Sequence, residues 1–161
     1  MRRLVPLTLA ISTLATLGAT APRARHAHPD FTGTWNLDVA KSEGQMLPTS
    51  STLKVAQTDK ALTVDRTATA MGTTRSSTSV YNLDGSTSKN MVDAMGTKIE
   101  FSSTLEWNAD VLVVKTTAPV GPGFSSTEKW TLSEDKKTLT IAGEATIGPQ
   151  SVSTKLVYAK E

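Results

Sequence analysis

The stretch that decides the fold covers residues 61–81 and reads ALTVDRTATAMGTTRSSTSVY. Apolar and polar residues alternate at its two ends, with Leu62 and Val64 on one face of an extended chain, and Met71-Gly72 lies at its centre. Side chains of a strand alternate between two faces, and a Gly in a two-residue loop is typical of a β-hairpin. The stretch therefore predicts two antiparallel strands joined by a tight turn.

Two later stretches resemble this hairpin. Each begins with a short apolar segment and ends with a Ser/Thr-rich segment that closes on an aromatic residue: 61–64 with 77–81, 111–114 with 126–130, and 138–141 with 153–158. Internal duplication and the small vocabulary of β-strands explain this similarity equally well. Either way, consecutive hairpins indicate an antiparallel meander.

The same alternation continues from Phe31 to the end of the chain, which predicts an all-β domain with about 8–10 strands. Two-residue loops are expected at 59–60, 71–72 and 109–110, a four-residue loop at 134–137, a rim loop at 119–123, and a helical turn near 39–44. A meander of this size has unpaired edges unless it closes on itself. The predicted architecture is therefore an up-and-down, lipocalin-like β-barrel.

A resemblance to known proteins supports this architecture. Residues 30–35, Asp-Phe-Thr-Gly-Thr-Trp, resemble the Gly-x-Trp opening of lipocalins and other calycin barrels. The chain also resembles uncharacterised bacterial exported proteins that open with Phe-x-Gly-x-Trp-x-Leu, and it shares their Lys41-Ser42, 83–85 and 129–133 segments. The resemblance implies that Trp35 packs at one end of the barrel. Lipocalins usually place an Arg against this Trp, whereas this chain ends with Lys155 and Lys160.

The first thirty residues predict export. Arg2 and Arg3 precede a mainly apolar run over 4–17, which is too short for a permanent membrane helix and is typical of a secretory signal peptide. We expect a signal peptide at 1–21, a linker at 22–30 and a barrel domain at 31–161, in the periplasm or the medium. After cleavage, no integral membrane segment is expected, and without Cys the fold uses no disulfide.

The charge balance argues against nucleic acid as a partner. The chain has 17 Lys and Arg residues and 15 Asp and Glu residues, and four of the basic residues precede position 30, which leaves 13 basic residues in the domain. A domain near neutrality has no electrostatic attraction for a polyanion.

Catalytic and metal-binding patterns are weak. His26 and His28 are the only histidines and Cys is absent, so the usual nucleophile–base pairs cannot form within the domain. The spread carboxylates leave a carboxylate-based enzyme open, but we expect no enzyme and no cofactor. His26, His28 and Asp30 have metal-ligating chemistry, yet a solvated linker lacks the support that fixes ligands, so no metal site is predicted.

Three charged residues are predicted to face inward. Alternation places Arg66 with Leu62 and Val64, Arg75 with Tyr81, and Glu128 with Trp130. Three alternatives remain open: Glu128 pairs with the arginines, the charges reach a wet barrel mouth, or the arginines hold a ligand's carboxylate or phosphate. Under the third alternative, the candidate ligand-binding residues are Arg66, Arg75, Tyr81, Glu128 and Trp130.

Two functions fit these observations. The first is an exported binding module for a small ligand, such as a fatty or aromatic acid or another amphipathic anion. The second is a structural or interaction protein whose barrel is filled. A binding module is expected to hold a pocket of several hundred Å³, lined by apolar groups and a few polar ones, whereas a packed interior would favour the second function.

Overall fold

The computed structural model describes residues 28–45, 47–94 and 96–161. The expected signal peptide lies outside these residues. The described chain is almost entirely β-structure: β1 Gly33–Leu37, the 3-10 helix η1 Val39–Lys41, β2 Glu43–Gly44, β3 Ser50–Gln57, β4 Ala61–Ala70, β5 Thr73–Asn82, β6 Ser88–Ala94, β7 Thr97–Asn108, β8 Val111–Ala118, β9 Phe124–Leu132, β10 Thr138–Ile147 and β11 Gln150–Lys160.

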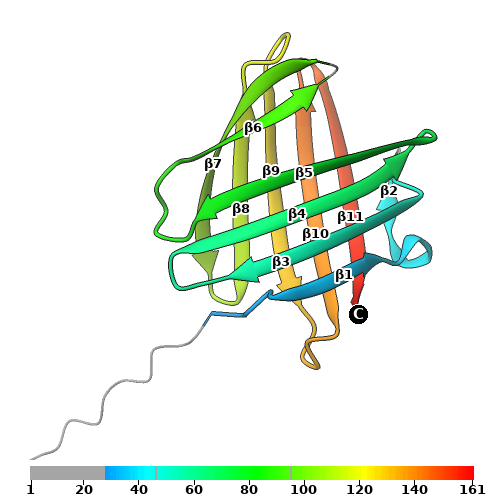
Figure 1. Ribbon diagram of the computed structural model, residues 1–161, viewed down its shortest axis with the longest axis vertical. Helices are drawn as coiled ribbons and strands as arrows, with labels where there is room; N and C mark the ends of the chain where they lie inside the picture. The colour runs from blue at the N-terminus through cyan, green and yellow to red at the C-terminus, as the bar shows by residue number, and fades with distance from the viewer. Residues whose placement is uncertain (1–27, 46, 95) are drawn as a thin grey trace, which may run out of the picture.

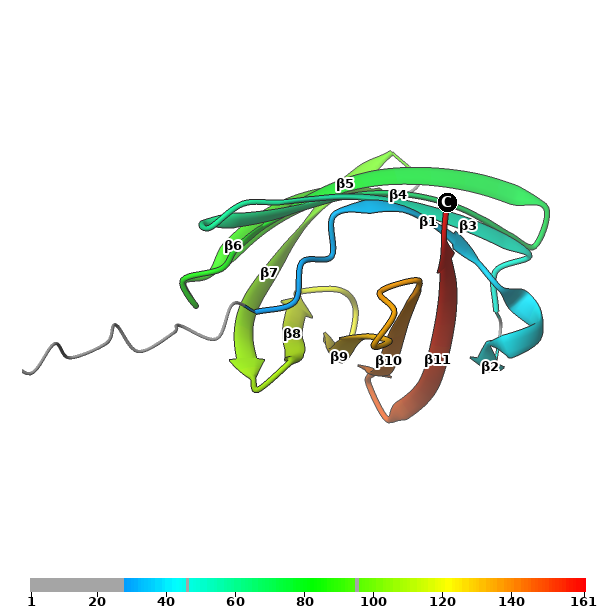
Figure 2. The same ribbon diagram turned by 90° about the horizontal axis from the view of Figure 1, so that it is seen from below.

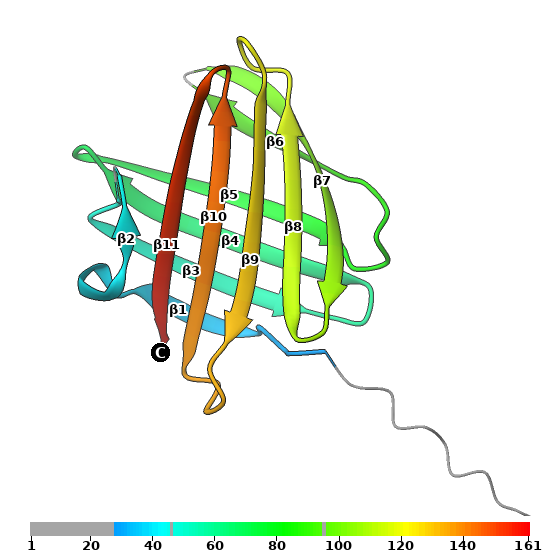
Figure 3. The ribbon, with the colours of Figure 1, turned by 180° about the vertical axis from the view of Figure 1, so that it is seen from behind.

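All strands belong to one 11-stranded sheet, whose order is β5-β4-β3-β1-β11-β10-β9-β8-β7-β6, with β2 beside β11. Figures 1 and 3 show that β1, β3, β4 and β5 cross β8–β11 steeply, as two layers of a flattened barrel. Seen from below, the sheet curls almost completely around its interior (Figure 2). The predicted all-β antiparallel meander is therefore confirmed, as a nearly closed barrel.

The three similar stretches form hairpins with equivalent registers. Each places a buried Leu directly opposite its closing aromatic residue: Leu62 pairs with Tyr81, Leu112 with Trp130, and Leu139 with Tyr158. The Leu residues are fully buried within the main hydrophobic cluster. Cross-strand pairs of this kind are the basic unit of sheet stability. The hairpin pattern thus sets both the register and one end of the core.

Turn chemistry agrees with the predicted loops. Met71 and Gly72 have φ angles of 50° and 75°, the left-handed conformation that a type I′ hairpin turn requires. The Ser133 N–H donates to the Thr138 carbonyl and so closes the predicted four-residue loop. The expected two-residue and four-residue loops at these positions are therefore confirmed.

Trp35 is fully buried, as predicted, at the end of the barrel where the chain enters. Its indole Nε1 donates to the Phe31 carbonyl over 2.9 Å. The Lys160 ammonium lies 5.1 Å from the centre of the Trp35 ring, where a cation is attracted to the indole face. At Gly33, whose φ is +145°, a Cβ atom would come within 2.7 Å of Lys160 Cε.

The barrel closes at a seam between β5 and β6 that has no backbone ladder. The Asn90 amide instead accepts from the Val80 N–H over 2.8 Å and donates to the Val80 carbonyl over 3.1 Å. The Ser88 hydroxyl accepts from the Asn82 N–H over 2.7 Å. Side-chain hydrogen bonds, and not the backbone ladder that a closed sheet predicts, therefore close the barrel at this seam.

No helix within the described part of the chain is long and apolar enough to span a membrane.

Candidate ligand-binding site

The interior contains a cavity beyond the hydrophobic core. It has two lobes of about 190 Å³ and about 70 Å³, and both are lined by Arg66 of β4, by Ser77, Ser79 and Tyr81 of β5, and by Glu128 of β9. The smaller lobe reaches the core at Val64 and Trp130. The larger lobe extends away from it and adds Asn90, Val92, Phe101, Ser103, Thr116, Phe124 and Ser126.

The inner end of this cavity carries both of its charges. Arg66 is partly buried, and within the described residues its guanidinium makes neither an ion pair nor a hydrogen bond. Burial disfavours the charged form, but the Glu128 carboxylate, with Tyr158 and Tyr81, raises the pKa of Arg66 overall. The side chain is therefore a cation with free donors.

Glu128 is positioned by its neighbour on the same face of β9. The Trp130 indole Nε1 donates to Glu128 Oε2 over 3.0 Å. Within the described residues this is the only hydrogen bond to the carboxylate, so Oε1 is available as an acceptor. Among those residues, no side-chain nitrogen or oxygen sealed from solvent lacks a partner. The unpaired donors of Arg66 and the free oxygen of Glu128 therefore reach open space.

Tyr81 completes the inner end. Burial raises the pKa of Tyr81, and the negative charge of Glu128 raises it further, while Ser79 and Arg66 act in the opposite direction. The phenol is therefore neutral at physiological pH and can donate a hydrogen bond.

The outer end of the cavity is more apolar. Phe101 and Phe124 pack edge to face, with ring centres 5.5 Å apart, beside Val92. Strands rise about 3.3 Å per residue, so the backbones of Phe124 and Glu128 lie about 13 Å apart along β9. A molecule that spans the cavity thus meets charge at one end and aromatic surface at the other.

Hydroxyl groups line the walls between these ends. The Ser103 and Thr116 hydroxyls hydrogen-bond to each other over 2.8 Å, whereas no hydrogen bond joins the Ser77 or Ser126 hydroxyls to the described chain. The two lobes, of about 190 Å³ and about 70 Å³, are smaller and more polar than the apolar pocket of several hundred Å³ expected for a binding module. Ser side chains, at positions where alternation predicts inward-facing residues, account for the polarity.

The structure brings four of the five predicted site residues together. Arg66, Tyr81, Glu128 and Trp130 line the cavity. Arg75 lies opposite Ala68, as the turn predicts, but its side chain is exposed and does not line the cavity. The inward assignment of Arg75 is corrected because β4 and β5 extend together beyond the barrel at the Met71-Gly72 turn (Figure 1).

The structure also separates the predicted ion pair and places one of the two histidines. Arg66 and Glu128 share the cavity without an ion-pair contact, so the directly bonded pair that headed the alternatives is absent from the described residues. Those residues contain no group of three or more potential metal ligands. His26 lies outside them, and the His28 ring stacks on Trp107 with ring centres 4.3 Å apart.

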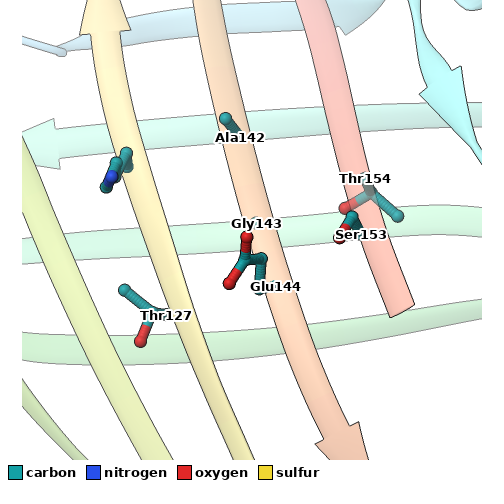
Figure 4. A pocket seen from close by; sticks show the side chains of 7 residues that line it. Thr127, Ala142, Gly143, Glu144, Ser153 and Thr154 are labelled. Atoms are coloured by element: carbon teal, nitrogen blue, oxygen red, sulfur yellow. The ribbon is translucent and has the colours of Figure 1, made fainter. Parts of the chain in front are cut away.

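A larger groove of about 340 Å³ lies on the outer face of β9, β10 and β11 (Figure 4). Gly143, Lys129 and Glu144 are among the residues that line this groove, and the side chains of Lys129 and Glu144 are exposed. Water competes fully for such exposed groups. The interior cavity, with its partly buried unpaired charges, is therefore the candidate binding site.

Comparison with known proteins supports the fold alone. No protein-family model and no curated protein sequence matches the chain. Solved structures do match, and zebrafish ileal bile acid-binding protein in complex with cholic acid is among them, at 15% identity and a TM-score of 0.54 over 81% of this chain and 98% of that one. Secretory abundant heat soluble protein 4 of Ramazzottius varieornatus matches at 13% identity and a TM-score of 0.56 over 81% of this chain and 94% of that one. Apo lipid binding protein 8 of Caenorhabditis elegans matches at 13% identity and a TM-score of 0.57 over 81% of this chain and 95% of that one. Together with the strand order and register, this likeness identifies the fold as a calycin-type β-barrel.

Proposed function

We propose that the protein is an exported binding module for a small amphipathic acid, held inside the barrel with its anionic group on Arg66. The observation that carries this proposal is the unpaired guanidinium of Arg66 in the interior cavity. A planar guanidinium suits a carboxylate or phosphate because it donates two parallel hydrogen bonds. The neutral Tyr81 phenol and the free Ser hydroxyls provide further donors.

Cavity size limits the ligand to a small one. Sites for drug-sized molecules usually hold about 300–1,000 Å³, whereas the main lobe holds about 190 Å³. Because Phe101 and Phe124 form the outer end, a single aromatic ring is the best match for its apolar surface. Among fatty and aromatic acids, the proposal therefore favours an aromatic acid with a short side chain.

Two of the structural neighbours are named as binding proteins for related kinds of molecule, a bile acid and a lipid. This supports the use of such a barrel for an amphipathic ligand. The proposal assigns the protein no reaction. Its location in the periplasm or the medium rests on the signal-peptide pattern described above.

Isothermal titration with 3-phenylpropionate tests the proposal. Loss of a charge-assisted hydrogen bond costs about 1.5–3 kcal/mol, so Arg66→Met should weaken binding about tenfold to a hundredfold. Arg75→Met is the matched control, because Arg75 is exposed and does not line the cavity, and it should bind as the wild type does. Equal losses in the two variants, or binding that Arg66→Met leaves unchanged, would exclude Arg66 from the site.

A further inference from the structure

The cavity carries a carboxylate as well as a guanidinium, and this limits which acids it can accept. Arg66 and Glu128 line both lobes, so an anionic group seated on Arg66 lies in the field of the Glu128 carboxylate. The two formal charges cancel. A plain carboxylate on Arg66 is therefore attracted by the guanidinium and at the same time repelled by Glu128, so it gains less than it would from Arg66 alone.

The free oxygen of Glu128 supplies a way to overcome this repulsion. Trp130 holds Oε2, and Oε1 accepts no hydrogen bond within the described residues. Arg66 is too far away to form an ion pair with either oxygen. The space between the two charged groups therefore offers donors on one side and a charged acceptor on the other.

We propose, building on the function above, that the ligand is an aromatic acid that also carries a hydrogen-bond donor near its carboxylate, a hydroxyl or an ammonium group, and that Glu128 selects for this donor. The carboxylate lies on Arg66, the donor faces Glu128 Oε1, and the ring extends toward Phe101 and Phe124. This ligand satisfies both charges, whereas an acid without a donor satisfies one and leaves the other unpaired. A buried site with unpaired polar groups discriminates strongly against such an analogue.

Trp130 makes Glu128→Gln a sharp test. Its indole N–H requires an acceptor, so the Gln side chain must present its oxygen to Trp130 and its NH₂ group to the cavity. The substitution thereby changes the group that faces the ligand from an acceptor into a donor, with little change in shape. Glu144→Gln is the matched control, because Glu144 is exposed on the outer face of the neighbouring strand β10.

The experiment titrates the full chain with three probes of nearly equal size: 3-phenylpropionate, which has no added donor, 3-phenyllactate, which has a hydroxyl, and phenylalanine, which has an ammonium group. The wild type should bind at least one donor-bearing probe about tenfold to a hundredfold more tightly than 3-phenylpropionate. Glu128→Gln should abolish a preference for phenylalanine, whose ammonium group cannot accept a hydrogen bond, without weakening 3-phenylpropionate. A hydroxyl can accept from the Gln NH₂ group, so a preference for 3-phenyllactate is tested with Glu128→Leu, which should abolish it. Glu144→Gln should keep either preference. The preferred probe distinguishes a hydroxy acid from an amino acid.

The outcomes separate this inference from the proposed function. Wild-type protein that binds all three probes equally, with loss in Arg66→Met, overturns the role of Glu128 and leaves the proposed function standing. A preference for phenylalanine that survives Glu128→Gln, or a preference for 3-phenyllactate that survives Glu128→Leu, overturns the assignment of the selecting residue. If none of the probes binds, the proposed function fails and this inference fails with it.

Discussion

Replacement of Trp35 tests whether one aromatic side chain, at the end of the barrel where the chain enters, stabilises the whole domain. Trp35 has no exposed surface, donates a hydrogen bond to the Phe31 carbonyl and lies under the Lys160 ammonium. Truncation of a buried Trp to Ala costs about 3–5 kcal/mol. Loss of the partner of a buried carbonyl adds about 1–3 kcal/mol. Trp35→Ala should therefore lose about 4–8 kcal/mol, much of the stability of an ordinary domain.

Urea unfolding followed by far-ultraviolet circular dichroism measures this loss without relying on the fluorescence of the substituted residue. Trp35→Phe keeps most of the apolar contact and removes the N–H donor, so it should lose about 1–3 kcal/mol and remain folded if the Ala variant does not. Trp107→Ala serves as a comparison, since Trp107 is only partly buried, and it should lose less than Trp35→Ala. A loss below about 1 kcal/mol in Trp35→Ala would refute the assigned role of the Trp35 contacts.

Three further results are expected. Arg66→Met should raise the pKa of Tyr81 because it removes a nearby positive charge, and Glu128→Gln should lower that pKa because it removes a negative charge. Tyrosinate absorbance during alkaline titration measures both changes. Shifts in the same direction would contradict the cavity geometry. Hydrogen bonds from Thr32 lower the pKa of Asp30 below 3.8, so its contribution to stability is present at neutral pH and is lost as the pH falls through the folded-state pKa. Asp30→Asn should accordingly be less stable than the wild type near pH 7, with the difference disappearing in acid; a constant difference in urea midpoint would show that the carboxylate charge is not responsible. The melting temperature should be the same with and without reductant or chelator. The chain has no Cys, and its described residues contain no cluster of three potential metal ligands. A fall in melting temperature with chelator would reveal a structural metal.

Much of the fold follows from local pattern. Strand alternation predicts the inward positions of Arg66 and Glu128, because a period of two sets the face of each side chain independently of tertiary structure. The Met71-Gly72 turn predicts the pairing of Arg75 with Ala68, which the register confirms. These inferences depend only on residues that are close in sequence or on one hairpin.

Contacts across the barrel were not predictable in the same way. The separation of Arg66 from Glu128 depends on how β4 faces β9, two strands that are not neighbours in the sheet. The exposure of Arg75 depends on how far its hairpin extends beyond the layer underneath. The role of Asn90 in the seam could not be predicted from the sequence. A single Asn on an alternating strand fits equally well as a cavity-lining residue and as a hydrogen-bond partner of another strand's backbone.

The side-chain seam also determines how separate molecules meet. β5 and β6 end the ladder, and the Asn90 and Ser88 side chains cover only Val80 and Asn82 of the β5 edge. An uncovered strand edge can pair with another chain and promotes aggregation unless it carries charge. Arg75 on β5 and Lys89 on β6 are exposed charged residues on these two strands. Arg75, which does not line the cavity, is thus placed to oppose edge-to-edge association along the part of β5 that Asn90 and Ser88 leave uncovered.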